Sequence, residues 1–270
     1  MGDQTTVAVL CYHSISTQTT PTFARLTVDP SLFAEHMAAL RDQDVDVIAF
    51  FDVPDALADG RRAVAITIDD GLADAGENAC TVLAHLGMTA TLFVPSGYVG
   101  GHSAWLRGAD GRRPMLTREA IASLAREGFE IGSHSRSHLA ADLNRPELVE
   151  RDARASKHEL EDCIGRTVDS FAYPFGYHSP SARRAVRAAG YLQACAVGEL
   201  PARAGDDRWA LPRLQVHNHT TPEELVSMVT TSTPGPARAW ARSKQRVWSL
   251  GRRYAGWGPP EAGRIDEALR

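Results

Sequence analysis

Short apolar runs alternate with longer helical patterns along most of this chain, and this alternation limits the possible folds more than any other feature. Runs typical of buried strands lie at residues 7–12, 45–51, 63–68, 89–94, 129–133, 170–174, 192–197 and 211–216. Helical periodicity occupies residues 30–40, 73–86, 117–127, 146–164, 179–189 and 222–229. Strands that alternate with helices in this way pair in parallel through right-handed crossovers. The sequence therefore predicts an α/β fold with a parallel sheet.

The number of strand–helix units favours a closed sheet over an open one. About seven units in roughly 230 residues indicate a deformed (β/α)7–8 barrel, although periodicity alone does not separate a barrel from an open sheet. In both architectures, functional groups lie just beyond the C-terminal ends of the strands. We expect one catalytic barrel over residues 1–233 and a separate extension over residues 234–270.

Charge and composition exclude several classes of protein. The chain of 270 residues has a formal net charge of −4 at pH 7, which argues against binding nucleic acid through bulk positive charge. The N-terminus lacks the basic start and apolar core of a signal peptide, and no apolar stretch approaches the roughly 18 residues of a membrane span. The four cysteines are scattered without a CxxC pair, which fits reduced thiols. We therefore expect a cytoplasmic protein that binds no nucleic acid.

Two adjacent carboxylates, Asp69 and Asp70, follow the strand predicted at residues 63–68, and Gly71 comes next. Neighbouring residues of a strand point to opposite faces, so both carboxylates face one site only if the strand ends between them. Gly71 provides the freedom to turn there. Two carboxylates forced together out of water favour a bound cation or a shared proton. A solvated Asp-Asp-Gly turn is the alternative interpretation.

Two histidines four residues apart, His134 and His138, lie in the polar segment after the strand predicted at 129–133. If this segment is helical, their side chains lie about 5–6 Å apart on one face, which is half of many zinc sites. A pair of surface histidines is the alternative, since the glutamate of the HExxH pattern is missing. With one carboxylate from the Asp-Asp pair, the imidazoles complete the three-ligand set of a catalytic metal.

Three short motifs follow one another along the chain: TIDDG at 67–71, SHSRSH at 133–138 and FAYPFG at 171–176. They resemble the motifs T-F-D-D-G, H-[ST]-x-x-H and R-x-P-Y of the polysaccharide deacetylases of carbohydrate esterase family four, which share a deformed (β/α) barrel. The resemblance covers residues 7–230. It implies that Asp69 is the catalytic base and that Asp70, His134 and His138 bind the metal. It also implies that the backbone N–H of Phe175 faces the oxyanion.

The chain departs from the family pattern at two roles. The arginine of the third motif, which orients the base, is replaced by Ala172, and we expect Arg213, at the end of a later strand, to take its place. The late motif that carries the general acid is also missing. In the circularly permuted subgroup of poly-N-acetylglucosamine deacetylases, that histidine lies in an N-terminal Y-H, which the LCYH sequence ending at His13 resembles. His217 is the second candidate for the acid.

The resemblance implies a metal-dependent hydrolase that removes the N-acetyl group from an amino sugar in a glycan, a lipid-linked sugar or a small glycoside. Zinc is the first choice of metal, and cobalt, nickel or manganese also suit nitrogen and oxygen ligands. Trp105, in a glycine-rich segment, either stacks on a sugar or packs within the protein, and Tyr173 is a second candidate for substrate binding. The alternatives are a ring-amide hydrolase of the same superfamily and a glycan-binding barrel without catalysis.

A basic and aromatic segment follows the predicted barrel. Its cationic residues are Arg238, Arg242, Lys244, Arg246, Arg252 and Arg253. No acidic residue interrupts them, and Trp240 and Trp248 lie among them. This pattern is typical of a helix that lies on an anionic membrane surface, and docking on the acidic outside of the barrel is the alternative.

Overall fold

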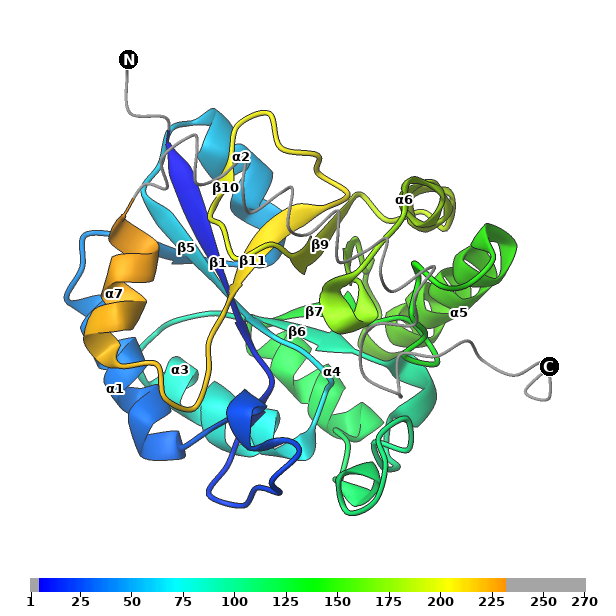
Figure 1. Cartoon of the computed structure of the whole chain (residues 1–270), viewed down its shortest axis with the longest axis horizontal. Helices are drawn as coiled ribbons and strands as arrows, with labels where there is room; N and C mark the ends of the chain where they lie inside the picture. Colours follow the sequence, from blue (N-terminus) through cyan, green and yellow to red (C-terminus); the bar gives the residue numbers. More distant parts are fainter. Residues whose placement is uncertain (1–4, 232–270) are drawn as a thin grey trace.

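Seven parallel strands close into a barrel in the computed structural model of the chain, which describes residues 5–231 (Figure 1). The barrel strands are β1 (Thr6–Tyr12), β5 (Ala63–Ile68), β6 (Thr91–Val94), β7 (Glu130–Ser133), β8 (Ser170–Ala172), β9 (Gln193–Val197) and β11 (Leu211–Gln215). The ring closes because β1 pairs in parallel with both β5 and β11. This arrangement confirms the predicted α/β barrel, with seven strands in the ring.

Four short strands lie outside the ring. They are β2 (Ser14–Ile15), β3 (Thr27–Val28), β4 (Asp46–Ile48) and β10 (Ala202–Arg203). The run at 45–51, predicted as one strand, supplies only the three residues of β4, which pair with β5 on the outside. It ends early because the Phe50 N–H donates to the side-chain oxygen of Thr91, at 2.8 Å, instead of continuing a strand ladder. An unpredicted helix, α2 (Val53–Ala58), follows directly, with Pro54 in its first turn.

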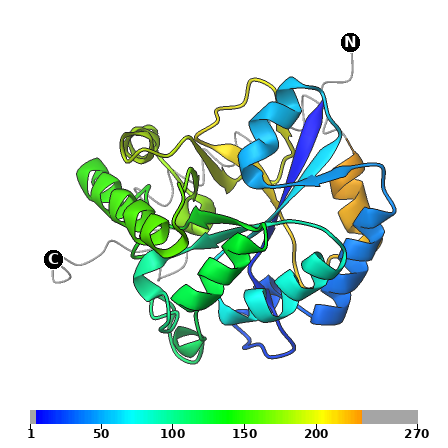
Figure 2. The ribbon, with the colours of Figure 1, turned by 180° about the vertical axis from the view of Figure 1, so that it is seen from behind.

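Helices surround the barrel on its outside, as the opposite views of Figures 1 and 2 show. They are α1 (Pro30–Arg41), α3 (Thr81–His85), α4 (Arg118–Arg126), α5 (Pro146–Ile164), α6 (Pro180–Ala188) and α7 (Pro222–Thr230). The predicted helices are confirmed, except that the one expected at 73–86 is wound as a π-helix over Ala75–Cys80 before α3 begins. Side-chain caps set several starts: Asp29, Thr117, Ser179 and Thr221 each accept a backbone N–H of the helix that follows.

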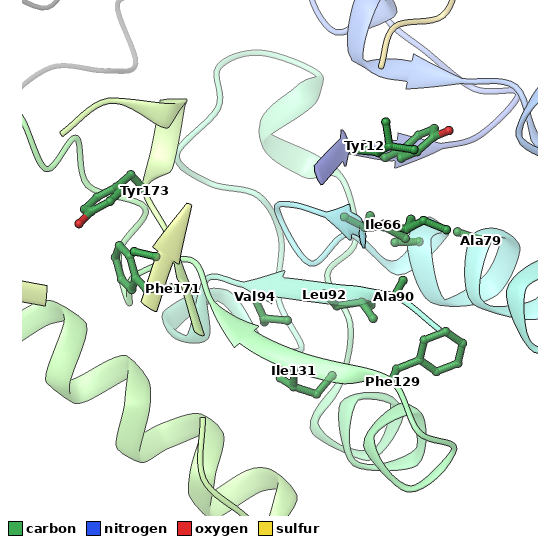
Figure 3. Packing of buried hydrophobic residues seen from close by; sticks show 14 of the residues in the cluster. Tyr12, Ile66, Ala79, Ala90, Leu92, Val94, Phe129, Ile131, Phe171 and Tyr173 are labelled. Carbon is green, nitrogen blue, oxygen red and sulfur yellow. The ribbon is translucent and has the colours of Figure 1, made fainter. Parts of the chain in front are cut away.

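The main core fills the layer between the barrel and the helices. Every residue of β5 is buried, so this strand lacks the polar alternation of a half-exposed sheet, as expected of parallel strands covered on both faces. Figure 3 shows Leu92 and Val94 of β6 with Ile131 of β7 in this layer. The helices therefore cover an apolar barrel surface.

A second apolar cluster surrounds Phe93, whose ring contacts that of Phe50 edge to face with the centroids 5.7 Å apart. Its other members include the smaller side chains of Ala172 and Cys195. Gly132 lies opposite Phe93 in the pairing of β6 with β7, and a Cβ there would lie 2.5 Å from the ring. The guanidinium of Arg213 lies 5.7 Å from the centre of the same ring. Phe93 therefore forms a floor beneath the polar end of the barrel.

The proposed membrane contact and the domain boundary at residue 233 involve a segment that the structure does not describe. The basic extension at 234–270 lies outside the described residues. Within residues 5–231, no helix combines the length and the apolar character that crossing a bilayer requires.

Gly132→Ala is expected to lower the free energy of unfolding by about 1–3 kcal/mol, because the added methyl group must displace the Phe93 ring inside a closed barrel. Urea denaturation followed by circular dichroism measures the change. Gly101→Ala is the matched control, since a Cβ there meets nothing closer than the Tyr98 carbonyl oxygen at 3.4 Å. Equal denaturation midpoints for the two variants would contradict the close packing of the interior.

Candidate active site

A buried ion pair joins the ends of two barrel strands. Asp69 follows β5, and Arg213 lies on β11. The Arg213 Nη1 and Nη2 atoms lie 2.7 Å from Asp69 Oδ1 and 2.6 Å from Asp69 Oδ2, so the guanidinium donates to both carboxylate oxygens. Both side chains are almost fully excluded from solvent. Nη1 also donates to the Thr67 hydroxyl at 3.1 Å, and this hydroxyl donates to the Leu10 carbonyl at 2.7 Å. The pair is therefore fixed to β1 as well.

The surroundings of Asp69 keep its carboxylate ionised. Burial raises the pKa of Asp69. The charge of Arg213, the nearby His134 and the Arg213 hydrogen bonds lower it by more, so the pKa lies below its ordinary value. The Cys11 thiol donates weakly to Asp69 Oδ2 at a distance of 3.6 Å. A carboxylate that is charged at neutral pH is in the state that a general base requires.

Asp70, His134 and His138 form a second buried group beside this pair. Asp70 Oδ1 lies 3.2 Å from His138 Nε2 and 3.6 Å from His134 Nε2. At metal–ligand distances of about 2.0–2.2 Å, two ligands of a tetrahedral ion lie about 3.4 Å apart. One ligand atom from each residue lies within 4.8 Å of the other two. The spacing and the donor types therefore fit one divalent metal ion.

The protonation of His134 supports the same fit. Its Nδ1 lies 2.9 Å from the Ala172 carbonyl oxygen. A carbonyl only accepts hydrogen bonds, so Nδ1 carries the proton and the lone pair of Nε2 faces Asp70. Burial lowers the pKa of His134 to about 4, which makes the ring neutral at pH 7. A neutral imidazole oriented by a backbone carbonyl is the usual form of a metal-binding histidine.

Aromatic rings hold His138 in place. Trp105 stacks on its ring with the centroids 4.5 Å apart and an interplanar angle of 17°. Phe175 contacts it edge to face at 4.8 Å. Trp105 also contacts Tyr98, at 4.8 Å. The structure thus gives Trp105 a packing role against a candidate ligand, and its contact with a sugar stays a prediction.

The backbone is strained where the candidate residues lie. Asp70, Ser135, His138 and Phe175 have φ angles of 72°, 62°, 53° and 60°, and they are four of the five non-glycine residues with a left-handed backbone in the described part of the chain. Such conformations persist where the surrounding structure enforces them, and they concentrate at functional sites. At Asp70 the left-handed turn follows the end of β5. It explains how two adjacent carboxylates face one site.

The motif analysis assigns no role to three residues of the site: Cys11 and Thr67, which lie within LCYH and TIDDG, and Asp152, which lies in no motif. Asp152, on α5, accepts the backbone N–H groups of Arg136 at 2.7 Å and Ser137 at 3.2 Å, and therefore holds the loop between the two histidines. A signal for Asp152 exists in the sequence. It lies on the buried stripe of α5 together with Val149, Ala153, Ser156 and Leu160, where a carboxylate needs a partner.

The two candidates for the general acid lie at neighbouring strand ends. His13 follows β1, and one of its ring nitrogens lies within 4.8 Å of a carboxylate oxygen of Asp69. His217 follows β11, and its Nε2 lies 3.0 Å from Arg25 Nη2. Burial and the positive charge of Arg25 lower the pKa of His217 to about 4, so at pH 7 this ring is neutral and not in the imidazolium form that a general acid requires. The lowered pKa argues against His217 as the general acid, and His13 stays the first candidate for this role.

The interpretation of Tyr173 as a substrate-binding residue is wrong. Its side chain is fully buried, and its hydroxyl donates to the Trp209 carbonyl at 3.0 Å. Figure 3 shows Tyr173 beside Phe171 in the core. Successive residues of an extended chain point to opposite faces. Because Ala172 faces the barrel interior, Tyr173 faces the helix layer.

Arg213→Met is expected to lower the free energy of unfolding at pH 7 by about 3–5 kcal/mol, because it leaves Asp69 buried without a counter-charge. Asp69→Asn in the same background should recover part of this loss. The loss should also shrink as the pH falls into the ordinary carboxyl range, since burial alone raises the pKa of Asp69 and protonation then removes the unpaired charge. Urea denaturation of the wild type, Arg213→Met and the double variant at two pH values measures these changes. A loss below about 1 kcal/mol, as at a surface pair, would contradict a buried charge pair.

Two solved structures share the architecture of this chain. The deacetylase PplD of Streptococcus pyogenes, solved in complex with acetate, superposes with a TM-score of 0.74 at 20% identity, covering 85% of this chain and 100% of that one. A de-N-acetylase from Aggregatibacter actinomycetemcomitans superposes with a TM-score of 0.69 at 19% identity, covering 82% of this chain and 99% of that one. At these identities, the likeness shows a shared fold.

Sequence comparison assigns the family. YxkH, a curated Bacillus subtilis (strain 168) protein whose name places it among the polysaccharide deacetylases, is 26% identical over 212 residues, which are 77% of this chain and 70% of that protein. The family model for polysaccharide deacetylase matches residues 57–194, just over half of the chain, and includes Asp69, Asp70, His134 and His138. This chain therefore belongs to the polysaccharide deacetylase family and is a hydrolase that removes acetyl groups from carbohydrates.

Proposed function

We propose that this protein is a metal-dependent N-deacetylase that removes the acetyl group from an N-acetylated amino sugar. The observation that carries the proposal is the pairing of an ionised, Arg213-bound Asp69 with a separate ligand group made of Asp70, His134 and His138. Two proteins of the same fold support this chemistry: one is a deacetylase solved in complex with acetate, and the other is a de-N-acetylase.

Asp70, His134 and His138 would hold the metal, with zinc as the first choice and cobalt, nickel or manganese as alternatives. When bound, a divalent ion polarises an acyl oxygen and lowers the pKa of water to about 7. The protein prepares the site for it, since the Ala172 carbonyl orients His134 and the Trp105 and Phe175 rings hold His138.

Asp69 acts as the general base and accepts a proton from the attacking water. Arg213 donates to both carboxylate oxygens and the Cys11 thiol donates to Oδ2, so Oδ1 keeps a lone pair for the water. Arg213 thereby takes over the role of orienting the base from the arginine that is missing in the third motif. A positioned base of this kind accelerates such reactions by about 10²–10⁴-fold.

Two other groups complete the reaction. The backbone N–H of Phe175 donates to the oxygen that gains negative charge when water adds to the acetyl carbonyl, and a donor of this kind contributes on the order of 3 kcal/mol to transition-state stability. His13 delivers a proton to the nitrogen as the carbon–nitrogen bond breaks, because an unprotonated amine anion leaves poorly. Acetate and the free amino sugar are the products.

Acetate release from N-acetylglucosamine oligomers tests the proposal. The wild-type protein should release acetate, and removal of metal by a chelator should abolish the release until metal is returned. Asp69→Asn should lose at least about 10²-fold in rate while it retains bound metal, because the base is removed and the three ligands remain. Since it also leaves Arg213 without its counter-charge, circular dichroism must show that the variant is folded. His138→Ala should lose both metal and activity, since two ligands hold a metal poorly. Metal content is measured by mass spectrometry, and a near-native rate for Asp69→Asn would refute the assigned roles.

A second pair of measurements separates acid catalysis from the other steps. His13→Ala should lower the rate of amide hydrolysis by about 10²–10⁴-fold but should leave hydrolysis of p-nitrophenyl acetate nearly unchanged, because nitrophenolate leaves without a proton. His217→Ala should lose less of the amide activity than His13→Ala. His85→Ala is the control, since this histidine is exposed on α3. An equal loss on both substrates for His13→Ala would show that His13 is not the acid.

A further inference from the structure

A cationic group faces solvent beside the candidate acid. In the pairing of β1 with β11, Cys11 lies opposite Gln215, and the Val216 N–H donates to the Cys11 carbonyl at 3.0 Å. His13 and His217 come next on their strands, so the two chains leave the barrel side by side. Arg25 reaches the same place from the loop before β3 and contacts His217. We name Arg25, His217 and His219 the basic rim.

The basic rim is held in a defined arrangement. The His217 and His219 rings stack with centroids 5.6 Å apart, and the Asn218 N–H donates to the Arg25 carbonyl at 3.1 Å. The Thr220 hydroxyl accepts the His217 N–H at 3.0 Å, and the Thr220 carbonyl lies 2.9 Å from Nε2 of the buried His36. The turn that carries the two histidines is therefore fixed to the core before any ligand arrives.

Within residues 5–231, no carboxylate forms an ion pair with Arg25. A guanidinium only donates hydrogen bonds, so His217 accepts through Nε2 and stays neutral. His217 uses one of the five N–H donors of Arg25, the side chain is exposed, and no other side-chain hydrogen bond of Arg25 is formed within residues 5–231. This cation is thus oriented, solvated and next to the site.

We propose that the basic rim binds a phosphate group of the substrate, so that the preferred substrate is a phosphorylated N-acetyl amino sugar. This inference rests on the proposed function, because it places the phosphate beside the acetamide that His13 serves. An exposed, planar guanidinium with several N–H donors, next to an imidazole, can donate hydrogen bonds to more than one oxygen of a phosphate. A free sugar phosphate and a nucleotide-linked sugar share this chemistry.

Binding to the Asp69→Asn variant tests the inference without turnover. Isothermal calorimetry compares N-acetylglucosamine, N-acetylglucosamine 1-phosphate, UDP-N-acetylglucosamine and N-acetylmuramic acid. At least one phosphate ligand should bind about 10- to 100-fold more tightly than the neutral sugar, and added salt should weaken that preference. Tighter binding of the free sugar phosphate than of the UDP sugar, or the reverse, identifies the source. Equal binding of N-acetylmuramic acid, which carries a carboxylate, would overturn the choice of phosphate.

Substitutions in the same background assign the preference to Arg25. Arg25→Ala should abolish the phosphate preference and leave binding of the neutral sugar unchanged, and Arg25→Lys should retain part of it because the charge remains without the planar donors. Arg62→Ala is the matched control, since this exposed arginine lies before β5, at the opposite end of the strands. A phosphate preference that survives Arg25→Ala overturns the inference.

The failure of this inference differs from the failure of the proposed function. Acetate release from neutral oligomers, with no phosphate preference in binding, overturns the inference and leaves the deacetylase proposal intact. An Arg25-dependent phosphate preference without acetate release from any sugar supports the rim as a phosphate site and refutes the proposed reaction.

Discussion

The bidentate contact between Arg213 and Asp69 connects the fold of this protein to its chemistry. Arg213 lies on β11 and Asp69 directly follows β5, and β1 is the strand that pairs with both. Thr67 extends the contact to the Leu10 carbonyl of β1, and Phe93 lies beneath it. A buried ion pair of this kind is retained only where its hydrogen bonds are well made, because desolvation opposes it. Closure of the barrel brings the partners into register and keeps water away.

Strain and packing at this end of the barrel serve one purpose, which is to present polar atoms that regular structure would turn away. The left-handed backbone at Asp70 directs its carboxylate toward the histidines, and the same conformation at His138 ends the loop that carries them. Each such residue opposes stability by about 1–3 kcal/mol. Contacts from elsewhere offset this strain: Asp152 holds the loop between the histidines, and Trp105 stacks on His138.

The elements that sequence periodicity predicts best are those whose burial pattern or capping can be recognised from neighbouring residues. The strand β5 has the expected bounds because its apolar residues are consecutive in the sequence. The helix α7 begins where expected because the capping residue Thr221 comes directly before it. The run at 45–51 ended early because the partner of Phe50 is Thr91, on a distant strand. The motif spacing predicts that Asp69, Asp70, His134 and His138 lie together, whereas Asp152 belongs to no motif and Cys11, although it lies within LCYH, has no role in the motif. The prediction for Tyr173 is wrong because successive side chains of an extended segment alternate, so Tyr173 points away from the face on which Ala172 lies.

Two arginines at this site show why residue type alone does not predict a role. Arg213 is buried and forms an ion pair with Asp69. It therefore determines the protonation state and the orientation of the base. Arg25 is exposed, and its side chain contacts the neutral ring of His217. A buried and paired cation acts on the protein, whereas a solvated cation held in a fixed direction acts on what approaches from solution. The difference comes from the positions of the two residues: one lies inside a barrel strand, and the other lies on the loop that borders its open end.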